Sequence, residues 1–372
     1  MVAPVDPPQP FGLYVHVPFC AARCDYCSFA TWTDRHHLVE AYLEACVLDA
    51  DRLVAAGMPA VTSVFVGGGT PTLVPGAALV EVLARVPRSP DCEVTVECNP
   101  DDVTADLLAT YRAGGVNRLS FGVQSTSAHV LQALGRTHDR DNVARCVDLA
   151  RAAGFATFNL DVIYGGAGES LDDWCRTLDD VVALDPPHVS AYALTVEAGT
   201  PLAADASRHP DDDDQADKYL AAVERLGGAG YESYEISNWA KPGHECRHNA
   251  LYWSMGEYQG LGCAAHSHRD GRRFWNLRTP DRYIDAVRSR ASVEAAGEQL
   301  AADERSLEAL QLAIRTRDGV PRTSFTDDDL HELGELLAPV DADGDRVALT
   351  VPGRLLANEV ALRLRVPPTP PN

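Results

Sequence analysis

The sequence of 372 residues predicts an α/β protein built around a parallel sheet. Six short runs of β-branched and apolar residues recur between positions 13 and 196. Segments with apolar residues three to four positions apart separate these runs. Strands that alternate with helices form right-handed βαβ units, so their strands lie parallel. Six units are too few for a closed barrel of about 250 residues, and a partial barrel or an open doubly wound sheet remains.

Each element of this prediction has its own local signal. The predicted strands cover 13–19, 61–66, 92–97, 117–123, 155–163 and 188–196. The predicted helices cover 37–56, 76–85, 103–113, 139–153 and 170–184. Glycines stand where three of these helices should end, at Gly57, at the pair Gly114-Gly115 and at Gly154.

The alternation of strands and helices breaks at an acidic stretch, DASRHPDDDD, which covers 205–214. Its aspartates could bind a metal ion, but acids before a helix more often cap its free N–H groups and complement its dipole. A helix should follow at 215–228. Helices at 303–316 and 327–337 and a short ribbon at 346–351 suggest a small helical or winged-helix-like lobe.

The sequence therefore suggests two domains between flexible ends. We expect a disordered N-terminal segment at 1–12 and a partial barrel at 13–214. A smaller C-terminal α+β domain should cover 215–365, and a tail should cover 366–372.

The charge balance and the N-terminus exclude several classes of protein. With 32 basic and 54 acidic residues the net charge is −22, which argues against nucleic-acid binding and against docking on anionic lipid. The N-terminus lacks a basic and apolar signal pattern, and no apolar run reaches the ~18 residues of a membrane span. We therefore expect a cytosolic protein with reduced thiols.

Three of the ten cysteines form a cluster directly after the first predicted strand: Cys20, Cys24 and Cys27, spaced C-x3-C-x2-C. The other seven are scattered through apolar patterns and are expected to be small buried hydrophobic residues. Zinc would need a fourth ligand from elsewhere, such as His16, His36 or His37. A [4Fe–4S] cluster held by three cysteines would leave one iron open to an outside ligand. This compact spacing favours the cluster.

Six motifs, in order along nearly the whole chain, carry a family resemblance: LYVHVPFCAARCDYC, FVGGGTPT, VECNPDD, RLSFGVQS, NLDVIYGG and HNALYW. The first resembles the cysteine loop of the radical S-adenosylmethionine (SAM) superfamily. Together they are similar to the oxygen-independent coproporphyrinogen III oxidase family, and most of all to its haem chaperone branch. The resemblance implies a partial (β/α)6 barrel with a C-terminal domain, a [4Fe–4S] cluster on Cys20, Cys24 and Cys27, and SAM on the open iron.

The resemblance also implies a SAM site at the carboxyl ends of the strands. Glycines there let the backbone approach a ligand closely, and an arginine can pair with the SAM carboxylate. An acid can accept hydrogen bonds from a ribose or an ammonium group, and Asp161 stands alone in an apolar strand where an unpartnered carboxylate is costly. The candidate residues are Tyr14, Tyr26, Gly68, Gly69, Thr70, Glu97, Gln124, Arg136 and Asp161.

Two departures from the oxidase pattern favour the chaperone branch. Oxidase-type members carry a further cysteine where this chain has Phe29, and a longer segment before the cysteine loop. In the chaperone branch the H-N-x-x-Y-W motif is implicated in holding haem, which makes His248 a candidate haem ligand. The alternative is that His248 anchors the C-terminal domain. His266 and His268 could also face the site.

The sequence thus supports a haem chaperone that binds a [4Fe–4S] cluster, SAM and haem and delivers haem to an acceptor haemoprotein, such as a membrane-bound respiratory enzyme. An oxygen-independent coproporphyrinogen III dehydrogenase is the alternative, and a zinc-stapled barrel without redox chemistry is the third hypothesis. The resemblance also suggests a homodimer. It leaves open whether SAM is cleaved.

Overall fold

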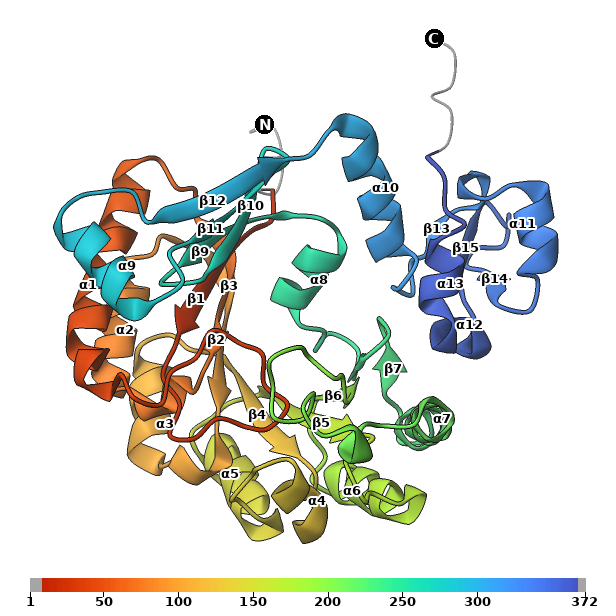
Figure 1. Cartoon of the computed structure of the whole chain (residues 1–372), viewed down its shortest axis with the longest axis horizontal. Helices are drawn as coiled ribbons and strands as arrows, with labels where there is room; N and C mark the ends of the chain where they lie inside the picture. Colours follow the sequence, from red (N-terminus) through yellow and green to blue (C-terminus); the bar gives the residue numbers. More distant parts are fainter. Residues whose placement is uncertain (1–8, 367–372) are drawn as a thin grey trace, which may run out of the picture.

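A computed structural model of the protein describes residues 9–366, and its main feature is one twelve-stranded sheet (Figure 1). The strand order is β12-β11-β10-β9-β1-β2-β3-β4-β5-β6-β8-β7. Six neighbouring strands are parallel: β1 (Phe11–Val17), β2 (Val61–Gly68), β3 (Arg88–Cys98), β4 (Arg118–Gln124), β5 (Thr157–Tyr164) and β6 (His188–Ala193). In the described residues β12 and β7 form the two outer edges, so the sheet is an open, partial barrel.

The helices that follow these strands lie outside the curved sheet (Figure 1). They are α1 (Val39–Ala55), α2 (Gly76–Ala84), α3 (Ala105–Ala113), α4 (Ala128–Ala133), α5 (Arg140–Ala152) and α6 (Leu171–Ala183). The six predicted strands and five predicted helices are confirmed to within a few residues. The sixth helix, α4, was not predicted, because six residues are too few to show a helical period.

Strands from the second half of the chain extend this sheet at both edges. Beside β1 lie β9 (Glu257–Leu261), which is parallel to it, and then the antiparallel strands β10 (His266–Arg269), β11 (Arg272–Asn276) and β12 (Glu294–Gln299). Beside β6 lie β8 (Asn238–Ala240) and β7 (Glu232–Ser233). Residues on both sides of position 214 therefore share one sheet, and the division into domains at that position stays a prediction.

The acidic stretch begins helix α7 (Asp212–Gly228). The side chain of Asp211 accepts a hydrogen bond from the backbone N–H of Asp214 at 3.0 Å, which is an N-cap contact. The capping interpretation of the aspartate run is therefore confirmed.

The last part of the chain has a small core of its own, around Ile314, Val320, Val347 and Val360. It contains α10 (Ala302–Ala313), β13 (Val320–Pro321), α11 (Asp327–Glu332), β14 (Leu337–Pro339), β15 (Arg346–Leu349), α12 (Val351–Leu355) and α13 (Ala357–Ala361). The helix predicted at 327–337 is shorter than expected, because Leu337 instead pairs with Leu349 in a three-stranded antiparallel sheet.

The ends of the chain fall mostly outside the described residues. Of the segment predicted to be disordered at 1–12, residues 1–8 lie outside them, and Phe11 already begins β1. The predicted tail at 366–372 lies outside them except for its first residue.

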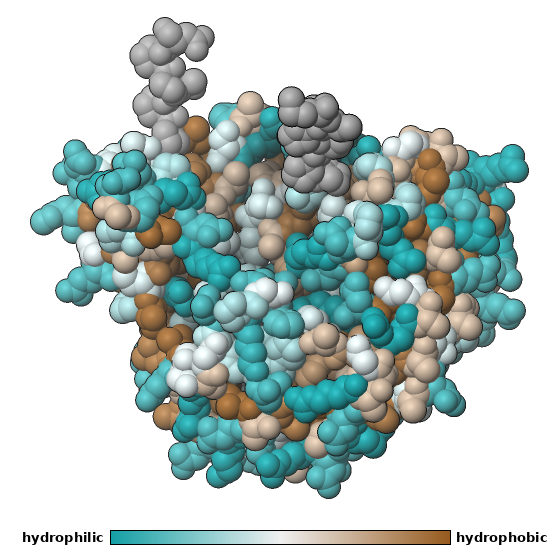
Figure 2. Space-filling model, turned by 180° about the vertical axis from the view of Figure 1, so that it is seen from behind, coloured by the Kyte–Doolittle hydropathy of each residue, from teal (hydrophilic) through white to brown (hydrophobic). Residues whose placement is uncertain are grey.

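Figure 2 shows hydrophilic residues over most of the rear face, with hydrophobic residues in small groups. Within the described part of the chain, no helix has the length and apolar character needed to cross a membrane.

The two faces of the sheet differ in polarity, and the polar side chains of the concave face form the site. On β1, Leu13, Val15 and Val17 are buried in the apolar core, whereas Tyr14 and His16 alternate with them on the concave face. Helix α8 (Arg247–Trp253) lies against β1 and β2.

The remaining helices are α9 (Pro280–Arg288), which packs on α1, and the 3-10 turns η1 (His36–Leu38), η2 (Pro71–Leu73), η3 (Pro100–Asp102), η4 (Ala206–Arg208) and η5 (Arg322–Ser324).

Candidate functional site

The cysteine loop follows β1 at the carboxyl edge of the sheet. Cys20, Cys24 and Cys27 are free thiols, and all three are partly exposed. Burial raises the pKa of the Cys20 and Cys27 thiols. Burial was predicted for all seven other cysteines, and it is wrong for Cys175, which is partly exposed. The prediction is confirmed for six: Cys46, Cys92, Cys98, Cys146, Cys246 and Cys263.

Backbone hydrogen bonds give this loop a fixed shape. The N–H of Cys20 donates to the carbonyl oxygen of Trp32 at 3.1 Å, which ties the start of the loop to its end. The N–H of Cys27 donates to the carbonyl oxygen of Cys24 at 3.2 Å. The guanidinium of Arg23 also donates to the carbonyl oxygen of Cys27, at 3.1 Å. The three thiols are thus carried by one compact turn.

The glycine-rich loop after β2 packs directly on the cysteine loop. The hydroxyl of Thr70 lies 3.7 Å from the Cys20 sulfur as a donor, and the N–H of Gly69 donates to the carbonyl oxygen of Val17 at 2.7 Å. Gly68 has a φ of +107°, and a Cβ at this position would lie 2.3 Å from the ring of His16. Only glycine fits there, because the backbone needs both the left-handed conformation and the space.

Two carboxyl groups lie near each other on the concave face. The N–H of Gly68 donates to Glu97 Oε2 at 3.2 Å. Burial, together with the charge of Asp161, raises the pKa of Glu97 to about 8. Asp161 accepts hydrogen bonds from Ser120 at 2.7 Å and from Asn159 at 2.8 Å. The sequence predicts a ligand for Asp161, and the structure gives this carboxylate partners within the chain.

Arg136 joins the cysteine loop to the ends of β3 and β4. Its guanidinium donates to Asn99 Oδ1 at 3.0 Å and to the carbonyl oxygen of Gly122 at 2.8 Å, and it lies 3.8 Å from the Cys24 sulfur. Gln124 ends β4 with a φ of 62°, next to a break in the pairing register with β5. A non-glycine residue in this conformation is uncommon and often marks a functional site.

The two predicted tyrosines have different surroundings, since Tyr26 lies within the cysteine loop and Tyr14 lies on β1. Tyr26 packs against the apolar side chains of Leu134 and Leu194, and burial raises the pKa of its hydroxyl. Tyr14 lies on β1, and its hydroxyl is 3.0 Å from His16 Nδ1. The structure therefore brings most of the predicted SAM residues to one edge of the sheet, with Tyr14 further back along β1.

The donor set of the loop fits an iron–sulfur cluster. Among residues 9–366, no three His, Cys, Asp or Glu side chains converge as the ligands of one metal ion do. The thiolates of a [4Fe–4S] cluster each bind a different iron, so they need not converge on one point. Two of the candidate fourth ligands for zinc are already engaged, since His16 Nε2 pairs with the carbonyl oxygen of Ala30 and His36 Nε2 pairs with that of Cys20, both at 2.9 Å.

His248 lies away from this edge of the sheet. Its side chain is 1% exposed and stacks on Phe65, and Nδ1 lies 2.9 Å from the hydroxyl of Ser63. Ser63 precedes Gly68 by five residues along β2, a distance of about 17 Å at ~3.3 Å per residue. Because Nε2 is also paired, with the Tyr252 hydroxyl at 2.8 Å, this structure has His248 in the anchoring arrangement.

A carboxylate from β3 holds the start of helix α8 in place. Glu93 accepts hydrogen bonds from the backbone N–H groups of Arg247 and His248, each at 3.2 Å. These are free donors at a helix N-terminus, which a carboxylate satisfies well. The motif that contains His248 is thus fixed against the sheet.

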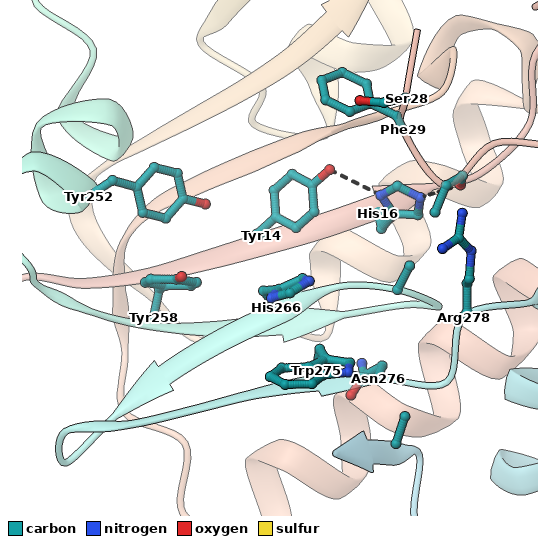
Figure 3. A pocket seen from close by; sticks show the side chains of 13 residues that line it. Tyr14, His16, Ser28, Phe29, Tyr252, Tyr258, His266, Trp275, Asn276 and Arg278 are labelled. Atoms are coloured by element: carbon teal, nitrogen blue, oxygen red, sulfur yellow. Dashed lines mark hydrogen bonds between the residues drawn. The ribbon is translucent and has the colours of Figure 1, made fainter. Parts of the chain in front are cut away.

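A cavity of about 530 Å³ lies between the cysteine loop, α8 and strands β1, β9, β10 and β11 (Figure 3). Its size falls within the ~300–1,000 Å³ range of ligand pockets. Aromatic side chains dominate its lining, and His266 and Arg278 supply nitrogen groups. The lining residues are Tyr14, His16, Ser28, Phe29, Ala30, Tyr252, Tyr258, Ala264, His266, Trp275, Asn276, Arg278 and Ala295.

Sequence reasoning did not identify most of this cavity. Tyr258, Trp275 and Arg278 come from β9, β11 and the loop after β11, and no motif marks them. Tyr252 belongs to the H-N-x-x-Y-W motif, so that motif was the available signal. Phe29, which stands where oxidases have a cysteine, is 62% exposed and lines the cavity.

Comparisons with known proteins agree with the sequence motifs. Residues 14–181 match the family model described as "Radical SAM superfamily". The chain is 41% identical to "Heme chaperone HemW" of Mycobacterium tuberculosis (strain ATCC 25618 / H37Rv), over 96% of this chain and 95% of the relative. It is 36% identical to the protein of the same description from Escherichia coli (strain K12), over 85% of each chain.

The fold also has a solved counterpart. The structure of coproporphyrinogen III oxidase HemN from Escherichia coli, a radical SAM enzyme, superposes with a TM-score of 0.80. The match covers 95% of this chain and 89% of that one, at 24% sequence identity. At this identity the likeness establishes the fold.

Proposed function

Because the chain belongs to the HemW family of radical SAM proteins, we propose that it is a haem chaperone. It binds a [4Fe–4S] cluster, SAM and haem, and it passes haem to acceptor haemoproteins. Curated relatives at 30–41% identity are described as heme chaperones, and they match most of this chain.

The observation that carries the proposal is the aromatic cavity beside the cysteine loop (Figure 3). Haem is a flat apolar macrocycle with an iron that takes an axial ligand and with two propionate groups. Aromatic walls suit the macrocycle, an imidazole suits the iron, and a guanidinium suits a carboxylate. The cavity offers all three kinds of group, with His266 as an imidazole and Arg278 as a guanidinium.

The chemistry of the cavity supports haem over coproporphyrinogen III. Coproporphyrinogen carries four propionates and no metal, so its site needs several cationic partners. Among the lining residues, Arg278 is the one arginine and none is a lysine. The likeness to HemN concerns the fold, and coproporphyrinogen dehydrogenase is the alternative function.

The cluster and SAM would occupy the carboxyl edge of the sheet. Cys20, Cys24 and Cys27 would hold the cluster, which supplies one-electron chemistry when bound. The glycine-rich loop presents its backbone beside them, and Arg136 can turn its guanidinium toward a carboxylate within reach of Cys24. The remaining candidate SAM residues are Tyr14, Tyr26, Gly68, Gly69, Thr70, Glu97, Gln124 and Asp161.

The partners of the chaperone follow from the same proposal. The acceptor is a haemoprotein, such as a membrane-bound respiratory enzyme, and the protein acts in the cytoplasm as a homodimer. Nucleic acid is not a partner, since a net charge of −22 opposes binding to phosphate backbones.

One anaerobic preparation tests the proposal against both alternatives. We expect about four irons per chain and a saturable Soret difference spectrum when haem is added. We also expect no conversion of coproporphyrinogen III to protoporphyrinogen under reducing conditions with SAM. Conversion would establish the dehydrogenase instead, and zinc without iron would establish the structural barrel.

A further inference from the structure

We propose that His266 is the axial ligand of the haem iron and that Arg278 pairs with a haem propionate in the cavity of Figure 3. This inference rests on the proposed function, because it assumes that the protein binds haem. It assigns the iron to a histidine of β10, outside the H-N-x-x-Y-W motif.

His266 is the lining histidine whose imidazole is free to bind a ligand. Its side chain is exposed, and its ring nitrogens form no hydrogen bond with any residue in the described range 9–366. The other lining histidine, His16, has both ring nitrogens paired, one with Tyr14 and one with the carbonyl oxygen of Ala30. His248 is likewise paired through both nitrogens and is not among the lining residues.

The ring of His266 is held in a defined orientation without using its nitrogens. It stacks on the indole of Trp275, with the ring centroids 5.5 Å apart and an interplanar angle of 26°. This contact joins neighbouring strands, since His266 on β10 pairs directly with Trp275 on β11. A stacked imidazole loses less conformational freedom when it coordinates a metal, which favours binding.

Arg278 supplies the anion-binding group at the same cavity. Its side chain is exposed, and the described residues offer it no ion pair or side-chain hydrogen bond. The nearby Arg273 is instead committed to Glu298 and Glu308. An unpaired guanidinium beside an aromatic cavity is well suited to bind a carboxylate in a bidentate manner.

The walls of the cavity provide contacts for the macrocycle. Tyr14, Tyr252 and Tyr258 come from β1, α8 and β9, and Figure 3 shows them along one side of the cavity with His266 nearby. Tyr252 and Tyr258 pack edge to face, with centroids 4.7 Å apart. The exposed ring of Phe29 from the cysteine loop also lines the cavity. Bound haem would therefore lie next to the cluster loop.

The test is a haem titration of the cluster-loaded protein, followed by difference absorption and electron paramagnetic resonance (EPR) spectroscopy. Subtracting the spectrum of the haem-free protein removes the cluster absorption. We expect His266→Ala to weaken haem binding by about tenfold or more and to remove the signature of a nitrogen ligand. Free imidazole should restore that signature. His331→Ala, which removes an exposed histidine of α11, is the matched control and should behave as the wild type.

Arg278→Gln is the second variant. It should weaken haem binding while leaving the axial-ligand spectrum unchanged, because it removes a propionate contact and no iron ligand. For both variants, iron content and SAM affinity should match the wild type, which separates a local effect from unfolding.

The possible outcomes separate the inference from the proposed function. If the wild type binds haem and His266→Ala gives the same spectrum, the ligand assignment is overturned and the haem-binding function stands. If His266→Ala binds haem more weakly with an unchanged spectrum, the assignment is also overturned. If the wild type shows no saturable haem binding, the proposed function fails and the inference fails with it.

Discussion

The Nε2 atom of His248 lies 2.8 Å from the hydroxyl oxygen of Tyr252, one helical turn further along α8. The other ring nitrogen of His248 is held by Ser63. Tyr252 in turn lines the aromatic cavity. The histidine of the H-N-x-x-Y-W motif is thus buried and hydrogen-bonded to the tyrosine of the same motif, and that tyrosine lines the cavity.

This relationship predicts that the main effect of His248→Ala is a loss of folding stability, with a smaller effect on haem binding. The substitution leaves a cavity and removes the partner of Ser63 and Tyr252, which should cost about 2–4 kcal/mol of folding free energy. Haem affinity should fall moderately, since Tyr252 is no longer oriented. The spectrum of bound haem should stay that of the wild type. A lost axial-ligand signature in His248→Ala would show that His248 binds the iron instead.

The cysteine loop leads to a prediction about iron content. Replacing Cys20, Cys24 or Cys27 by serine should abolish cluster assembly, since each thiolate would bind a different iron. Cys175→Ser is the matched control, because Cys175 is also a partly exposed free thiol but lies on α6. Iron and sulfide analysis after anaerobic reconstitution measures the effect. Full iron content in any of the three loop variants would contradict the assignment.

Two glycines with similar backbone conformations allow the glycine-rich loop to be tested. Gly68 and Gly57 have φ values of +107° and +89°, but a Cβ at Gly57 would meet nothing within 4 Å. Gly57→Ala should therefore cost only the left-handed strain, about 1–2 kcal/mol. Gly68→Ala should cost more, because the ring of His16 would have to move.

The cluster gives a second measurement on the same pair. His16 pairs with the carbonyl oxygen of Ala30 in the cysteine loop, so its displacement should also lower iron content in Gly68→Ala. Thermal unfolding and iron analysis of both variants decide the point. Equal losses of stability and iron in the two variants would refute the close-packing argument.

Glu97 predicts a particular pH dependence of stability. Its pKa of about 8 in the folded protein lies above the ordinary value of 4.5, so the folded state favours the protonated carboxyl. The folded state therefore binds more protons than the unfolded state between these values, and Glu97 costs stability as pH rises through this window. Glu97→Gln, which mimics the protonated form, should gain stability over the wild type more at pH 9 than at pH 5.

Unfolding temperatures at the two pH values provide the measurement. Glu81→Gln serves as the control, because Glu81 is an exposed residue paired with Arg85 on the outside of the sheet. It should show no such difference between pH 5 and pH 9. A constant gap between Glu97→Gln and the wild type at both pH values would mean that Glu97 is not held protonated.

Much of the fold could be predicted because its signals are local. Apolar runs in the sequence indicate the six parallel strands, and the capping of α7 by Asp211 depends on residues within one turn. The additional strands could not be predicted in the same way. β7 has two residues and β8 three, and the pairing of β9 with β1 joins segments about 240 positions apart.

The candidate site likewise has a part that is local in the sequence and a part that is not. The cysteine loop is contiguous in the sequence, so its spacing alone indicates a metal cluster. The cavity is assembled from separate segments, with Tyr14 on β1, Tyr252 on α8 and His266 on β10. No single motif contains these residues. Burial of Asp161 does not by itself indicate a ligand, because a neighbouring strand and its own strand supply the hydrogen-bond partners that a buried carboxylate requires.

The parallel pairing of β1 with β9 has a consequence for how the protein is made. β1 leaves the ribosome well before β9, yet β9, which covers one of its edges, ends at Leu261. Until then that edge carries unpaired backbone groups beside an apolar core, a state that invites association with other chains. A nascent chain stalled before β9 therefore has an open template at β1, and the synthesis of β9 is what closes it.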